Sequence, residues 1–175
     1  MSEVQEPHPQ PPPRKRRGDY DVPHVISKRY SKISESIQKQ VHQRAKCLCE
    51  YCHASEQWQY VQFTVDHIMP LSLGGTDNLE NLALACFHCN RRKTNRLTAT
   101  DLQSGEEVLL FNPRQHIWSD HFIWSVDGLL IVGLTPIGRV TVTVLALNRE
   151  RVINIRAADK EIGRHPPMDD LIQEK

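Results

Sequence analysis

Residues 64–93, "TVDHIMPLSLGGTDNLENLALACFHCNRRK", gather several side chains that could do chemistry. Asp66 and His67 are adjacent, Asn81 lies fourteen residues after His67, and Asn90 lies nine residues further on. An imidazole titrates near neutral pH and can take a proton from water, while carboxylate and amide oxygens suit Mg²⁺ or Mn²⁺. A base beside one hard cation can hydrolyse a phosphodiester bond. The structural alternative is a buried Asp–His pair.

Four of the five cysteines form two Cys-x-x-Cys pairs, with 33 residues between the pairs. A two-residue spacer lets both thiolates of a pair bind one ion at ~2.3 Å, and a redox motif would need a thioredoxin-like context that the sequence lacks. We therefore predict one structural, four-coordinate zinc site. Its ligands are Cys49, Cys52, Cys86 and Cys89. Cys47 is left over, because its one-residue spacing from Cys49 fits a ligand pair poorly.

Periodicity predicts the elements that position these residues. Apolar residues at every fourth position indicate an amphipathic helix over 31–45, and alternation with β-branched and aromatic types favours a strand over 58–68. Glycines and turn formers at 74–78 indicate a loop. After the loop we expect a short helical segment, the second cysteine pair, and a helix that starts near Cys89 or Asn90.

The region 106–160 has a different sequence pattern. Short apolar runs separated by Asn-Pro, Asp-Gly and Gly signals predict a small antiparallel sheet. "RVTVTV" alternates like a strand, yet Thr135-Pro136 is also a plausible helix start, so both readings stay open. "NRERVINIRAADKEI" is typical of a helix with Asn148 as its cap.

A chain of 175 residues that is 39% hydrophobic predicts a modest core with poorly ordered ends. We predict an α+β fold: a zinc-stapled module with a β-rich C-terminal extension. The predicted parts are a Pro-rich, basic arm (1–23), the module (24–104), the extension (105–162) and a disordered tail (163–175).

Charge and hydropathy limit the function classes. The formal net charge of +1 does not mark the whole chain as a nucleic-acid binder, but basic residues cluster at 28–46 and again at 91–96. The apolar runs are too short to span a bilayer, and the first thirty residues have no apolar signal-peptide core. Paired cysteines fit metal binding in a reducing compartment. We expect a soluble, cytoplasmic protein with no membrane partner.

From "RAKCLCEYC" through "VDHIMPLSLGGTDNLENLALAC" to "CNRRK", the chain resembles the HNH endonuclease family. The resemblance runs from about Val41 to Lys93 and implies a ββα-metal fold, in which a divalent cation lies between a β-hairpin and a helix. The departure is Asn90, which stands where many members have histidine. Asparagine also occurs there in members that look like active nucleases.

The resemblance implies a role for each residue of the set. His67 is the general base, Asp66 and Asn90 hold the catalytic Mg²⁺ or Mn²⁺, and Asn81 bonds backbone across the loop to orient His67. The expected products carry a 5′-phosphate and a 3′-hydroxyl. Because Asn90 follows Cys89 directly, the structural zinc would also fix the helix start that presents this ligand.

The expected partner is DNA, duplex or branched. The basic residues that follow the last cysteine would contact its phosphates without reading sequence; they are Arg91, Arg92, Lys93 and Arg96. Lys93 has a structural alternative, an ion pair within the module. The runner-up function is a non-catalytic zinc module that binds nucleic acid or protein, and a metal-dependent RNase or toxin ranks below it. Target specificity and oligomeric state stay open.

Overall fold

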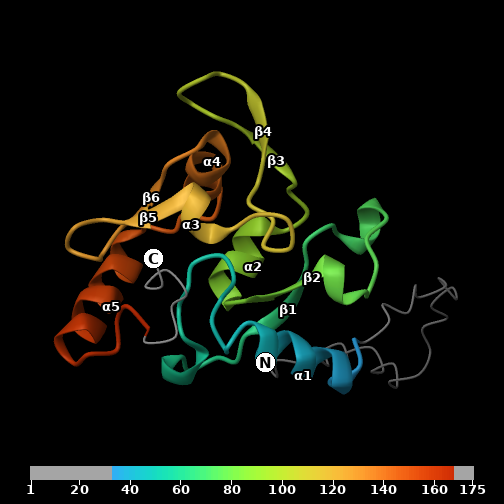
Figure 1. Cartoon of the computed structure of the whole chain (residues 1–175), viewed down its shortest axis with the longest axis horizontal. Coiled ribbons are helices and arrows are strands. Elements are labelled where there is room, and N and C mark those ends of the chain that lie inside the picture. Colours follow the sequence, from blue (N-terminus) through green and yellow to red (C-terminus); the bar gives the residue numbers. More distant parts are fainter. Residues whose placement is uncertain (1–32, 168–175) are drawn as a thin grey trace, which may run out of the picture. The chain divides into compact units, whose positions relative to one another are not determined.

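The structure, a computed structural model, describes residues 33–167. The predicted arm and residues 168–175 of the predicted tail lie outside the described residues. Within them, helices alternate with three two-stranded antiparallel sheets (Figure 1), which confirms the predicted α+β class. No helix among residues 33–167 is long and apolar enough to cross a membrane.

Helix α1 (Glu35–Arg44) confirms the helix predicted over 31–45, with its start at Glu35. Ser34 caps it, since its side chain accepts a hydrogen bond from Ile37 N at 3.3 Å. The apolar stripe buries Val41, and Ala45 is buried just after the helix ends. This face packs against strand β2.

The first sheet pairs β1 (Thr64–His67) with β2 (Leu82–Ala85). The strand predicted over 58–68 is too long: Glu56–Trp58 form the 3-10 helix η1, and Tyr60 is fully exposed. Alternation there has no partner strand to pair with. Periodicity does not predict β2, because all four of its residues are buried and none alternates with an exposed residue.

Helix α2 (Phe87–Lys93) begins two to three residues before the predicted start. Cys86 is the reason, because its Sγ accepts from Cys89 N at 3.4 Å and caps the helix. The predicted short helical segment before it is a single 3-10 turn, η3 (Leu79–Asn81), and another, η2 (Leu71–Leu73), precedes the loop. Helix α2 packs on both β1 and β2, giving the ββα arrangement.

After α2 the predicted small antiparallel sheet is instead two separate hairpins, and the extension is not β-rich, because more of its residues lie in helices than in strands. The ambiguous segment "RVTVTV" is helical, because Thr135 caps it by accepting from Gly138 N at 3.2 Å. The elements in order are β3 (Thr98–Thr100), β4 (Glu107–Leu109), α3 (Trp118–His121), β5 (Phe122–Trp124), β6 (Ile131–Gly133), α4 (Pro136–Val144) and α5 (Glu150–Glu161).

The prediction of Asn148 as the cap of α5 is wrong, since Arg149 occupies that position. The Asn148 side chain instead brackets a residue of β6: its Oδ1 accepts from Ile131 N at 2.9 Å, and its Nδ2 donates to Ile131 O at 2.8 Å. Two backbone groups at a strand end are satisfied in this way, which a local cap could not do.

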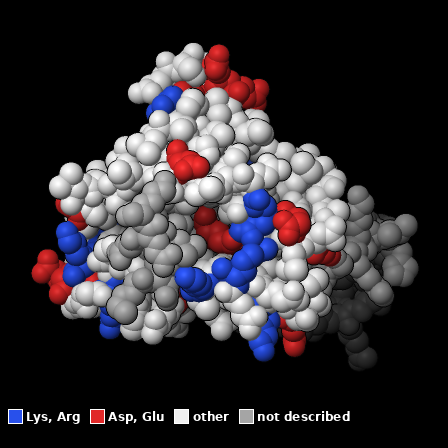
Figure 2. Space-filling view, viewed as in Figure 1, with Lys and Arg blue, Asp and Glu red and all other residues white. Residues whose placement is uncertain are grey.

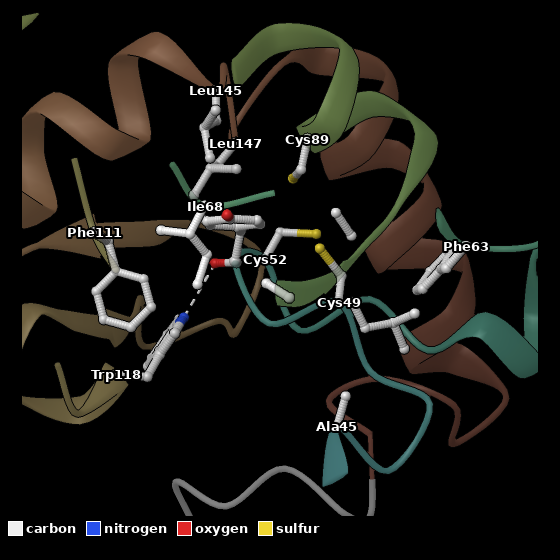
Figure 3. Packing of buried hydrophobic residues seen from close by; sticks show 14 of the residues in the cluster. Ala45, Cys49, Cys52, Phe63, Ile68, Cys89, Phe111, Trp118, Leu145 and Leu147 are labelled. Atoms are coloured by element: carbon white, nitrogen blue, oxygen red, sulfur yellow. Dashed lines mark hydrogen bonds between the residues drawn. The ribbon is translucent and has the colours of Figure 1, made fainter. Parts of the chain in front are cut away.

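The segment after residue 105 shares its core with the zinc module. Trp118 Nε1 donates to Tyr51 O at 3.2 Å, and Leu145 and Leu147 belong to the same buried cluster as Cys49 (Figure 3). The loop of the β3–β4 hairpin crosses the predicted boundary at 104/105. The division into a module (24–104) and an extension (105–162) stays a prediction, while the buried cluster is continuous across that boundary.

Candidate active site and metal centre

The four paired cysteines meet at one point. Their Sγ atoms all lie within 4.8 Å of one another, and Cys49, Cys52 and Cys89 turn their sulfurs toward the same space (Figure 3). The first pair lies in a tight turn, in which His53 N donates to Cys49 O at 2.8 Å. The second pair begins α2. The two cysteine pairs are distant in the sequence but adjacent in the fold, so their four thiols meet at one site, as the sequence predicted.

The surroundings of these thiols fit zinc. Burial raises the pKa of Cys49, so a thiolate there needs a cation beside it. Four thiolates on Zn²⁺ leave a net charge of −2, and Arg149 and Arg156 line the same cavity as Cys52. Burial lowers the pKa of both guanidinium groups, and the negative cysteines oppose that shift. The C-terminal helix region therefore supplies compensating charge to the cluster.

Asn81 closes the loop between β1 and β2. Its Oδ1 accepts from Met69 N at 2.9 Å, and its Nδ2 donates to Met69 O and Thr76 O, each at 2.9 Å. Gly75 permits this approach, because a Cβ there would lie 1.8 Å from Met69 O. The amide therefore spans the loop that follows His67, which is the geometry required of an orienting residue.

His67 contacts Asp77, a residue that the sequence did not identify as part of the site. Its Nε2 lies 2.7 Å from Asp77 Oδ1, and both side chains are partly exposed. Asp77 belongs to the "GGTDN" loop that Asn81 holds in place. An acidic residue inside a loop between a candidate base and its orienting asparagine is the signal that could have identified it.

Asp66 is 6% exposed and lies in a network of two partners. Tyr51 Oη donates to Asp66 Oδ2 at 2.8 Å, and Lys93 Nζ lies 3.1 Å from the same oxygen. Lys93 Nζ also donates to His67 O at 2.8 Å. Burial raises the pKa of Asp66, and the charge of Lys93 opposes that shift. The network fixes the carboxylate and the end of β1 together.

Asn90 faces the same strand from α2. Its Nδ2 donates to Thr64 Oγ1 at 2.7 Å. Thr64 and Asp66 are two residues apart on β1, hence on one face, and Asn90 and Lys93 are three apart on α2, hence on one side of the helix. The structure thus brings Asp66 and Asn90 to a single interface between β1 and α2.

The four predicted phosphate contacts divide into two kinds. Arg91, Arg92 and Arg96 are exposed, whereas Lys93 is 3% exposed and takes the structural pairing with Asp66. Figure 2 shows Lys and Arg side chains gathered in the middle of one face, in the region of α2, with acidic side chains beside them. Three of the four residues therefore remain available to an anionic partner.

Replacing Lys93 by methionine is expected to lower the free energy of unfolding by about 3–5 kcal/mol near pH 7, because a buried carboxylate would lose its counter-charge. Without Lys93 the folded-state pKa of Asp66 would rise further above its unfolded value. The difference in unfolding free energy between the two proteins should therefore have its full size above that pKa and shrink as the pH falls toward about 4. Urea unfolding of both proteins near pH 7 and pH 5 measures it.

Arg92→Met is the matched control, since Arg92 is exposed on the same helix. It should change the unfolding free energy by no more than about 0.5 kcal/mol. A Lys93→Met protein that is as stable as the wild type near pH 7 would contradict the buried pair.

Residues 49–96 match the model of the HNH endonuclease family. The matched segment contains both cysteine pairs and the set Asp66, His67, Asn81 and Asn90, so the resemblance predicted from the sequence is confirmed for this part of the chain. No curated protein and no solved structure matches the chain.

Proposed function

We propose that the HNH domain in residues 49–96 hydrolyses DNA phosphodiester bonds in a metal-dependent reaction, with His67 as general base, leaving 5′-phosphate and 3′-hydroxyl ends. The observation that carries this proposal is the contact of His67 with Asp77 at 2.7 Å, at the strand end held by Asn81 and Lys93. A carboxylate beside a partly exposed imidazole is an arrangement suited to proton transfer.

The contact supports Nδ1 as the nitrogen that acts. A carboxylate is an acceptor only, so Nε2 carries the hydrogen and Nδ1 is left as the basic nitrogen. In this proposal Nδ1 takes the proton from the attacking water, and the Asp77 charge stabilises the imidazolium that results. Asn81 keeps the loop closed, so that Asp77 stays opposite His67.

Asp66 and Asn90 are the residues that would hold the catalytic Mg²⁺ or Mn²⁺. The ion supplies stabilisation of charge on the phosphate and on the leaving 3′ oxygen. The site fits a hard cation, because Tyr51 and Lys93 orient the Asp66 carboxylate without using all of its lone pairs. The amide nitrogen of Asn90 donates to Thr64. Its side-chain carbonyl oxygen is the kind of ligand atom that Mg²⁺ prefers.

The exposed Arg91, Arg92 and Arg96 are proposed to contact the DNA backbone, duplex or branched. Such contacts hold the substrate in register and carry no sequence information. We also place the protein in the cytoplasm, since four free thiols that bind zinc require a reducing compartment.

The test is to incubate zinc-loaded protein with supercoiled plasmid and with a branched DNA substrate, adding Mg²⁺, Mn²⁺ or EDTA. Nicked or linear products should form with Mg²⁺ or Mn²⁺ and be absent with EDTA, and end-labelling should show 5′-phosphates. DNA binding without cleavage under every metal condition would favour the non-catalytic module instead, and cleavage of RNA alone would favour the ribonuclease.

Replacing Asp77 by asparagine is expected to lower the cleavage rate by about tenfold or more, because the imidazolium would lose its anionic partner while the hydrogen-bond geometry is kept. Asp77→Ala should be slower still. Single-turnover rates, with enzyme in excess of DNA and above the dissociation constant, measure both. Glu80→Gln, which changes an exposed acid of the same connection, is the control and should cleave at the wild-type rate; an equal loss in the control would contradict the role of Asp77.

A further inference from the structure

The fifth cysteine, Cys47, lies outside the zinc cluster and has other neighbours. Its Sγ, a ring nitrogen of His42 and a carboxylate oxygen of Glu56 all lie within 4.8 Å of one another. Cys47 is exposed, and the other two side chains are partly exposed. Three kinds of donor thus meet at a place that solvent can reach.

The backbone holds these three residues together. Cys47 N donates to His42 O at 3.1 Å, and Glu56 N donates to Cys47 O at 2.9 Å. Lys46 and Cys47 both have positive φ, 48° and 55°, which disfavours a residue with a side chain by ~1 kcal/mol or more each. The rest of the turn therefore imposes the conformation that turns Cys47 toward its two neighbours.

The side chains are also oriented before any ion arrives. His42 Nδ1 lies 3.1 Å from Glu56 Oε2, and Glu56 Oε1 accepts from Phe63 N at 2.6 Å. The backbone hydrogen bond leaves one carboxylate oxygen directed at the imidazole. An outer hydrogen bond of this kind is what fixes a carboxylate ligand in metal sites.

The donor set and its dimensions suit zinc. Imidazole, thiolate and carboxylate are the three zinc ligands of proteins, at about 2.0–2.3 Å from the ion, so two donors on one tetrahedral ion lie roughly 3.3–3.8 Å apart. The His42–Glu56 distance of 3.1 Å is already close to that range, and the Cys47 sulfur lies within 4.8 Å of both donor atoms. Binding would replace the hydrogen between imidazole and carboxylate and the thiol hydrogen by one ion.

We propose that His42, Cys47 and Glu56 form a second site for a divalent transition metal of the zinc class. Three protein ligands leave one position open to water, so this ion exchanges more readily than the ion held by four cysteines. His42 lies near the end of α1, before the first cysteine pair, and Glu56 begins η1, after that pair. An ion at this site would therefore link the two elements.

The test is the metal content of the full chain at equilibrium. Wild-type protein is dialysed against Zn²⁺, and separately against Co²⁺ as a spectroscopic probe, with Mg²⁺ in large excess to fill sites built from oxygen donors. Two equivalents per chain are expected. Cys47→Ser and His42→Ala should each bind one equivalent and keep the wild-type circular dichroism, since the four-cysteine site is intact.

Lys46→Ser is the matched control, because Lys46 is exposed and shares the left-handed backbone of its neighbour. It should bind two equivalents. One equivalent in the wild type, or two equivalents that survive either ligand replacement, would overturn the second site. Neither result depends on DNA cleavage, so failure here is distinct from failure of the proposed nuclease.

Discussion

Replacement of Cys86 by serine is expected to release the structural zinc and unfold the module. Binding free energies of structural zinc are about 10–16 kcal/mol, whereas a domain has only about 5–15 kcal/mol of stability in total. Cys86 is a candidate zinc ligand whose Sγ also caps α2, and a serine there can still cap the helix, so the expected loss is that of the zinc ligand. Zinc content after dialysis follows the release of the ion, and circular dichroism of the same sample follows the unfolding.

Unfolding should also follow from chelation of the wild type, and re-addition of zinc should restore the spectrum. Cys47→Ser is the control for loss of a thiol as such, since Cys47 lies outside the four-cysteine cluster. It should keep the native spectrum and the tightly bound ion. A Cys86→Ser protein that retains both would show that the four thiols are not what stabilises the module.

The sequence predicted the features that depend on spacing. Two-residue spacers place Cys49 with Cys52 and Cys86 with Cys89 whatever lies between the pairs, and the turn formers at 74–78 mark the loop between β1 and β2. These features are local or nearly so. For that reason they could be predicted without knowing the tertiary packing. The bonding of Asn81 to the backbone across the loop between β1 and β2 follows from the family resemblance and not from its spacing.

The errors share a different origin. Strand β2 has no polar face because α1 and α2 both pack on it. Asn148 does not cap α5, because its side chain binds Ile131, which lies seventeen residues earlier. Strand β2 and the Asn148 contact depend on packing between segments that neither periodicity nor spacing predicts, and there the tertiary partners overrode the local preference. Asp77, ten residues from His67, differs, because its place in the loop between His67 and Asn81 is visible in the sequence.

Lys93 shows the same limit within the site. In the sequence it is one of four basic residues after the last cysteine and looks like a phosphate contact. In the structure it occupies the side of α2 that faces β1, three residues after Asn90, where it neutralises Asp66. The helix places Lys93 on a different side from its exposed neighbours Arg91 and Arg92. Telling the buried lysine from the exposed arginines therefore depends on where α2 lies, Phe87–Lys93.

Replacement of His67 by alanine is expected to reduce the rate of DNA cleavage by about 10²–10⁴-fold, the range for loss of a general base. The fold should survive, because the side chain is partly exposed and its hydrogen bond is to the loop residue Asp77, while its backbone oxygen still accepts from Lys93. Affinity for DNA should also be kept, since the exposed arginines of α2 are untouched. Single-turnover cleavage, with enzyme in excess of DNA and above the dissociation constant and with saturating Mg²⁺, isolates the chemical step.

His116→Ala is the matched control, because His116 is a partly buried histidine that accepts from Asn112 N in the extension. It should cleave at the wild-type rate. Cleavage by His67→Ala within tenfold of the wild type would remove His67 as the base. Equal losses in both proteins would instead point to general destabilisation, which the unfolding free energies of the two variants would reveal. A rate loss confined to His67, with DNA binding and stability unchanged, is the result that a general base at this residue predicts.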